Sequence, residues 1–183
     1  MNNLGNNRFK KELESESLIY FNEKYEEVTG DFLEIVKICE RPDFICKRKD
    51  GTLVGVELVQ VCRGDPIMRS HDINVNKNLT MVPDRVQDLI QFLLYEKDKK
   101  RKSEDWKFPN QTILIIQLKE SPLHEISNAL SKESFFDLTD YGFIEIWVSD
   151  ESEIEAYDDI ELFCLFPSIL RRYYKRPIKK PFG

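Results

Sequence analysis

Hydrophobic residues recur along the chain with two periods, one typical of helices and one typical of strands. Leu18, Phe21, Tyr25 and Val28 fall at helical spacing and predict an amphipathic helix. Shorter runs rich in β-branched and aromatic residues predict strands. The expected elements are a helix at 8–28, a strand at 32–39, a β-hairpin at 42–61, a helix at 84–103, a strand at 111–118, a helix at 123–132, and strands at 142–148 and 160–166.

The order of these elements predicts an α/β fold. Three strands in succession favour an antiparallel meander, and the helix that follows them favours a crossover to a parallel neighbour. Residues 62–83 are polar and irregular, as expected of a long loop. A chain of 183 residues is long enough for one domain with a substantial core. We therefore expect residues 1–183 to form a single domain, a mixed sheet flanked by helices.

The hairpin predicts a specific pairing of its two arms. If Gly51 closes a three-residue turn in the left-handed region, Phe44 faces Val56 and Asp43 faces Glu57. Directly opposed side chains lie on the same face of a sheet, about 5 Å apart at Cβ. A two-residue turn would instead shift the pairing by one position and place the two acids on opposite faces.

The two opposed carboxylates suggest a cation site. Like charges facing each other in a sheet are unfavourable by about 1 kcal/mol or less when exposed, so the fold gains nothing from them. A divalent cation turns this repulsion into coordination, since Mg²⁺ takes one or two carboxylates together with waters and phosphate oxygens. Gly55, two residues before Glu57, leaves room for a ligand to approach. The simpler interpretation is a surface hairpin with two unrelated acids, but its flanking residues are strongly apolar.

Composition excludes several classes of protein. The chain is 41% hydrophobic and 33% charged, and no apolar run approaches the about 20 residues of a membrane helix. The first residues show no secretory signal, and the four cysteines show no Cys-x-x-Cys spacing. We therefore expect no membrane partner and a location in a reducing cytoplasm.

The charge distribution bears on binding partners. The net charge of −6 and the sequence pI of about 5.1 argue against a general nucleic-acid binder. Basic residues nevertheless cluster at 97–102 and 171–180. Such local patches can bind phosphate in a salt-dependent way, or they can be a solvated helix end and a solvated tail.

The two arms of the hairpin carry Pro-Asp-Phe at 42–44 and Gly-Val-Glu at 55–57. With the order of the elements around them, these motifs resemble the PD-(D/E)xK nuclease superfamily, and the resemblance covers residues 8 to about 166. It is similar in particular to bacterial and phage proteins with a PDF…GVE hairpin. The fold that this resemblance implies is a restriction-endonuclease-like core in αβββαβ order, here with extra C-terminal strands.

The resemblance also implies a metal site. Asp43 and Glu57 match the carboxylates that hold Mg²⁺ or Mn²⁺, and the carbonyl oxygen of Leu58 would be a further ligand. Glu14 could match an acid on the first helix that some members use for a metal-bound water.

The lysine of the motif is where this sequence departs from the family. The family lysine stands two residues after the glutamate, and this position is Val59. Gln60 is adjacent but points to the opposite face of a regular strand. Some members supply the lysine from a neighbouring element, and Lys97 or Lys100 on the helix at 84–103 could do so here.

Three functional hypotheses follow. The first is a metal-dependent nuclease that hydrolyses phosphodiester bonds, with DNA as the expected nucleic acid; a homodimer is compatible with it, since nucleases that cut both strands commonly dimerise. The second is a catalytically degenerate nuclease-like domain that binds a protein or a nucleic acid, motivated by Val59 and the acidic pI. The third is an unrelated α/β interaction module whose hairpin acids are solvated.

Overall fold

The computed structural model describes residues 3–61, 83–120, 122–131 and 138–177. The helices are α1 (Asn3–Thr29), α3 (Pro83–Arg101), α4 (Leu123–Leu130) and α5 (Ile154–Tyr157), and the strands are β1 (Glu34–Ile38), β2 (Phe44–Lys47), β3 (Leu53–Val61), β4 (Thr112–Leu118), β5 (Glu145–Asp150), β6 (Glu161–Phe166) and β7 (Tyr173–Tyr174). The expected loop at 62–83 lies outside the described residues except at its last position.

The described strands form one mixed sheet in the order in which they follow along the chain. Strands β1, β2 and β3 are an antiparallel meander, and β5, β6 and β7 are a second one. Between them, β3, β4 and β5 are parallel, because α3 and α4 carry the chain back across the sheet before the next strand begins. The expected mixed α/β architecture is confirmed.

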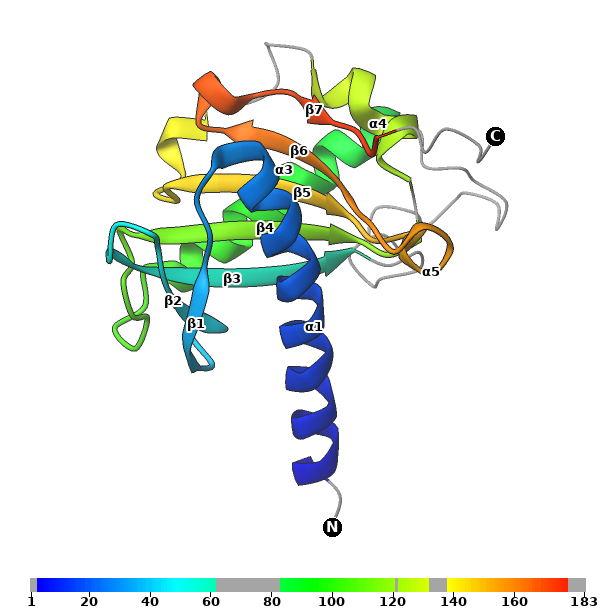
Figure 1. Ribbon diagram of the computed structural model, residues 1–183. Coiled ribbons are helices and arrows are strands. Elements are labelled where there is room, and N and C mark those ends of the chain that lie inside the picture. Colours follow the sequence, from blue (N-terminus) through cyan, green and yellow to red (C-terminus); the bar gives the residue numbers. More distant parts are fainter. Residues whose placement is uncertain (1–2, 62–82, 121, 132–137, 178–183) are drawn as a thin grey trace.

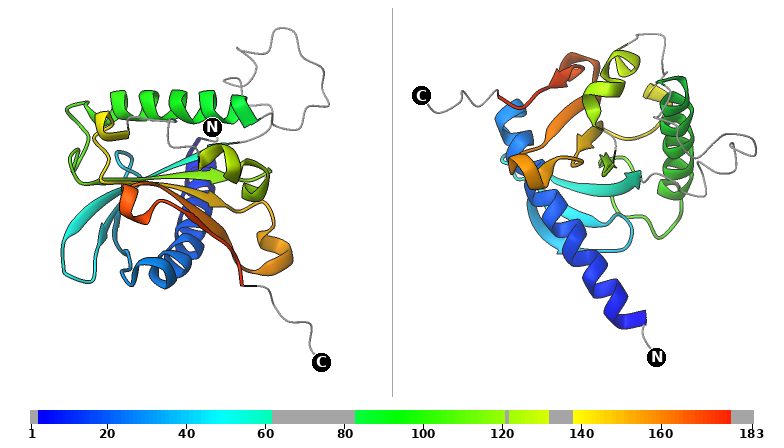
Figure 2. Two further views of the ribbon diagram at one scale, coloured as in Figure 1. Left: turned by 90° about the horizontal axis from the view of Figure 1, so that it is seen from above. Right: turned by 90° about the vertical axis from the view of Figure 1, so that its right-hand side faces the viewer.

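Helices cover both faces of this sheet (Figures 1 and 2). Helices α3 and α4 pack on one face, over a core that includes Leu94, Ile126 and Ile116. Helix α1 packs on the other face through Leu18, Phe21 and Tyr25, which meet residues such as Ile115 and Trp147. Strand β4 lies between the two cores and is buried along its whole length, as its continuous apolar run predicts.

Several boundaries differ from expectation. Helix α1 begins five residues earlier than the apolar stripe indicates. The strand expected at 142–148 is shifted to 145–150, although Ile144 already donates a backbone hydrogen bond to Thr112. Helix α5 and strand β7 were not expected, because elements of four and two residues are too short to show a period.

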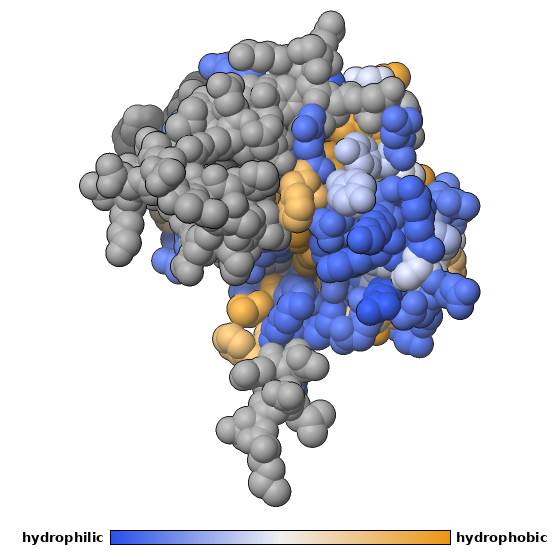
Figure 3. All heavy atoms as spheres, turned by 180° about the vertical axis from the view of Figure 1, so that it is seen from behind, coloured by the Kyte–Doolittle hydropathy of each residue, from blue (hydrophilic) through white to orange (hydrophobic). Residues whose placement is uncertain are grey.

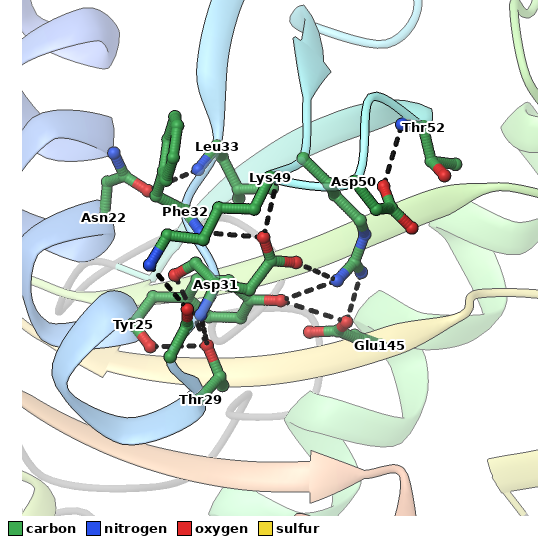
Figure 4. A network of polar contacts seen from close by, with 12 residues as sticks. Asn22, Tyr25, Thr29, Asp31, Phe32, Leu33, Lys49, Asp50, Thr52 and Glu145 are labelled. Carbon is green, nitrogen blue, oxygen red and sulfur yellow. Dashed lines mark hydrogen bonds and ion pairs between the residues drawn. The ribbon is translucent and has the colours of Figure 1, made fainter.

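A partly buried polar network fixes the hairpin to the rest of the fold (Figure 4). Arg48, at the hairpin turn, forms an ion pair with Asp31 at 2.7 Å and a second one with Glu145 of β5. Its guanidinium also donates to the hydroxyl of Tyr25 in α1 at 3.0 Å. Lys49 N donates to the Asp31 carboxylate at 2.9 Å. One arginine therefore joins α1, the hairpin and the central sheet.

The described surface is mainly hydrophilic on the side where α3 lies, with small apolar areas between the polar ones (Figure 3). Within the described part of the chain, no helix combines the length and the apolar character needed to cross a membrane.

Candidate functional site

The register of the hairpin is as its sequence predicts. Gly51 has φ +87°, and its N–H donates to the carbonyl of Arg48 at 2.9 Å. Phe44 pairs with Val56, and both face the core under α1. Glu57, next to Val56, therefore points to the opposite face, where it meets Lys97 of α3. Asp43 directly precedes β2, lies beside Glu57 in the lining of one cavity and contacts Lys11 of α1.

The two carboxyl groups are buried and contact the same short stretch of backbone. The amide of Asp43 donates to Glu57 Oε2 at 3.3 Å, and the amide of Leu58 donates to Asp43 Oδ2 at 3.0 Å. Burial raises the pKa of Glu57 well above its usual range; Lys97 opposes this shift, and the nearby charge of Asp43 adds to it. The pair is thus a place where negative charge is concentrated and positive charge is favoured.

Lys97 of α3 provides such a charge. Its Nζ lies 2.5 Å from Glu57 Oε1 and 3.4 Å from the carbonyl oxygen of Leu58. Val59, two residues after Glu57 on the same strand, packs its side chain against the core under α3. A lysine from the crossover helix therefore reaches the glutamate that a lysine in β3 would be expected to reach.

Lys100, the other candidate lysine, lies near the acids without pairing with them. Lys100 is exposed and lines the cavity in front of the acids. Among the contacts of the described residues, it forms no ion pair with Asp43 or Glu57. The structure thus separates two lysines that the sequence left as alternatives.

Helix α1 adds two further charged side chains. Glu14 lines the same cavity, as its place on the inward stripe of the helix suggested. Lys11, which sequence reasoning missed, forms ion pairs with Asp43 Oδ1 and with Glu14 Oε2, both at 2.9 Å. Burial lowers the pKa of Lys11, but the carboxylates of Asp43 and Glu14 outweigh it and raise this pKa. The signal for Lys11 was its position three residues before Glu14, one helical turn along the same stripe.

The expectation that Gly55 leaves room for a ligand is wrong. A Cβ at this position would lie 2.7 Å from Pro42 Cγ and 3.1 Å from Thr112 Oγ1. The proline ring already fills the space above the glycine. Gly55 therefore allows the residue before Asp43 to pack directly onto β3.

Two adjoining cavities open onto this region. The smaller has a volume of about 290 Å³ and is lined by both acids, Leu58 and Lys97. The larger, of about 820 Å³, runs between α1 and the C-terminal ends of β3 and β4. Four residues line both cavities: Lys10, Glu14, Leu58 and Lys97.

A second polar cluster lies in the wall of the larger cavity. The buried carboxylate of Glu151 accepts hydrogen bonds from Ser17 Oγ and Gln117 Nε2, both at 2.8 Å, and forms an ion pair with Lys119. Lys119 Nζ also donates to Ser17 Oγ at 3.0 Å. The cluster therefore joins α1, β4 and the end of β5 through one buried carboxylate.

The two carboxylates are enough to hold a divalent cation, but lysine ammonium groups contact the same atoms. An ammonium group already lies against Glu57 and the Leu58 carbonyl, two of the three expected ligands, and another lies against Asp43, the third. The described residues contain no group of three or more His, Cys, Asp or Glu side chains that could hold a metal ion. Mg²⁺ needs no more than one or two carboxylates when waters and phosphate oxygens complete its shell, so the pair is sufficient.

Comparison with models of protein families, with curated proteins and with solved structures found no match to this chain.

Proposed function

We propose that this protein is a metal-dependent nuclease with a restriction-endonuclease-like core. The observation that carries the proposal is the arrangement of Asp43, Glu57 and Lys97: two buried carboxylates that line one cavity, with an ammonium group 2.5 Å from one of them. The hairpin carries the two acids, α3 carries Lys97, and β4 pairs with the strand that carries Glu57.

Each residue has a role in this proposal. Asp43, Glu57 and the carbonyl of Leu58 would hold Mg²⁺ or Mn²⁺. Such an ion, when bound, polarises a phosphate and lowers the pKa of a bound water. Lys97 would then offset the negative charge that develops on the phosphate in the transition state. Glu14, at the edge of the same cavity, would position a water near the acids.

Cationic side chains at the mouth of the smaller cavity support a nucleic-acid substrate. Lys10, Arg41 and Lys100 line it beside the acids, and Lys10 and Lys100 are exposed. Contacts of this kind to phosphates do not depend on sequence and weaken as salt increases. We propose DNA as the substrate and expect binding only at low ionic strength, because the chain as a whole carries a net charge of −6.

The test is cleavage of labelled DNA and RNA, single- and double-stranded, at low salt with Mg²⁺ or Mn²⁺. Wild type should cut at least one substrate, and Asp43→Asn should abolish cutting. Lys97→Met should lower the rate by about 10²- to 10³-fold, as expected when a group that stabilises the transition state is removed. Lys100→Met should act mainly on substrate binding, and Lys102→Met is a matched control, since it removes the same charge from a lysine that pairs with Asp98.

The same assay separates the proposal from its alternative. Binding of nucleic acid without metal-dependent cleavage would favour a catalytically degenerate domain. Equal cleavage by wild type and Asp43→Asn would show that the activity does not come from this site.

A further inference from the structure

We propose that Lys11 is a built-in competitor for the divalent cation, and that its ammonium group must leave Asp43 before the ion can bind. The inference rests on the proposed function, because it concerns the same two carboxylates. It assigns to α1 a regulatory role at a site otherwise built from the sheet and α3.

Each carboxylate oxygen of Asp43 has one hydrogen-bond partner, a backbone amide on one side and an ammonium group on the other. Oδ2 accepts from the backbone amide of Leu58 at 3.0 Å, and this amide is fixed by the pairing of β3. The other oxygen, Oδ1, is 2.9 Å from Lys11 Nζ. The backbone amide is fixed, so the ammonium group is the partner of Asp43 that a metal ion could displace. Two cations cannot share one carboxylate oxygen at this distance without strong repulsion.

Lys11 also contacts a second carboxylate, with which it can stay paired after it leaves Asp43. Glu14 lies one turn along α1, and its Oε2 is 2.9 Å from the same ammonium nitrogen. Lys11 can therefore release Asp43 and keep an ion pair. Both side chains are largely buried, at 16% and 14% exposed, so this remaining pair is only weakly screened by solvent.

Lys97 does not have this freedom. Its contacts in the described structure are Glu57 and the carbonyl oxygen of Leu58, both proposed metal ligands, and it has no further carboxylate to pair with. A lysine that stays beside the bound ion suits a role in the reaction, whereas a lysine with an alternative partner suits a role as displaceable competitor. The two ammonium groups of the site are therefore not equivalent.

The test is calorimetric titration of Mn²⁺ into wild type, Lys11→Met, Lys11→Arg and Lys10→Met. Lys11→Met should bind Mn²⁺ at least about tenfold more tightly, since a single opposite charge at this distance typically changes the affinity of a carboxylate for a proton by 10-fold or more. Lys11→Arg keeps the charge and should stay near wild type. Lys10→Met is the matched control: Lys10 pairs with Glu14 at 3.3 Å and, in the described structure, has no contact with Asp43.

Asp43→Asn completes the set of variants. Thermal melting in the presence of a chelator shows whether each variant is folded without metal. Weaker Mn²⁺ binding in Asp43→Asn with unchanged affinity in a folded Lys11→Met would overturn the inference alone. Equal binding by wild type and Asp43→Asn would overturn the proposed metal centre itself. If Lys11→Met does not fold, Lys11→Gln replaces it, and the same criteria apply.

Discussion

Replacing Arg48 by methionine should destabilise the protein more than any comparable change at the hairpin surface. The substitution keeps most of the aliphatic chain and removes the guanidinium group. Two carboxylates, Asp31 and Glu145, then lose their cationic partner (Figure 4). Glu145 is only 7% exposed and keeps just its hydrogen bonds from Tyr25 and Trp147.

The expected magnitude follows from burial. Breaking a buried ion pair by removing one partner costs about 3–5 kcal/mol, and we take the lower end, about 3 kcal/mol, because Asp31 is still partly solvated. For a chain of this size each kcal/mol corresponds to about 2–4 °C, so the melting temperature should fall by roughly 6–12 °C.

The assay is thermal unfolding followed by circular dichroism at pH 7, together with urea unfolding. Lys49→Met is the matched control, because Lys49 pairs with Glu26 at an exposed position where both side chains are about half accessible. Its loss should cost less than about 1 kcal/mol. Equal effects of the two substitutions, or a change below 1 kcal/mol in Arg48→Met, would refute the view that this network anchors the hairpin.

Two further predictions concern the same region. Gly55→Ala should destabilise the fold by about 1–3 kcal/mol in urea unfolding, because the new methyl group would meet the ring of Pro42; a neutral effect would show that the ring shifts freely. Asp31→Asn should reduce stability at pH 6, and this effect should shrink as the pH falls below about 4. Burial alone would raise the pKa of Asp31, but hydrogen bonds from Lys49, Arg48 and Phe32 outweigh it and lower this pKa. The stabilisation is therefore present above about pH 4, the ordinary pKa of aspartate, and is lost as pH falls through the lower folded value. A difference between wild type and variant that does not shrink on acidification would contradict this assignment.

The register of the hairpin could be predicted from the sequence because one residue fixes it. Gly51 adopts the left-handed conformation, and the period of two then determines every pair along both arms. The long helices and the buried strand β4 were equally accessible, since their apolar patterns extend over several periods.

The arrangement of charges around Asp43 and Glu57 could be predicted only in part from the sequence. The spacing of Lys97 and Lys100 puts both near the sheet, and only the rotation of α3 about its axis decides which one reaches Glu57. Lys11 lies on a stripe that is otherwise apolar further along α1. From the sequence, a charged residue at such a position is predicted to be solvated, and only the structure shows that it lies next to Asp43. The role of Gly55 was misjudged because packing by Pro42 depends on how the chain enters β2, which no periodic pattern encodes.

The most direct test of the proposed centre is a crystal structure with Mn²⁺ and a short DNA strand, using anomalous scattering to locate the metal. We predict a manganese peak within coordination distance of the carboxylates of Asp43 and Glu57, with a phosphate oxygen beside it and Lys97 next to that phosphate. A map in which Lys11 and Lys97 still hold the two carboxylates, with no peak between them and the DNA bound elsewhere, would contradict the account.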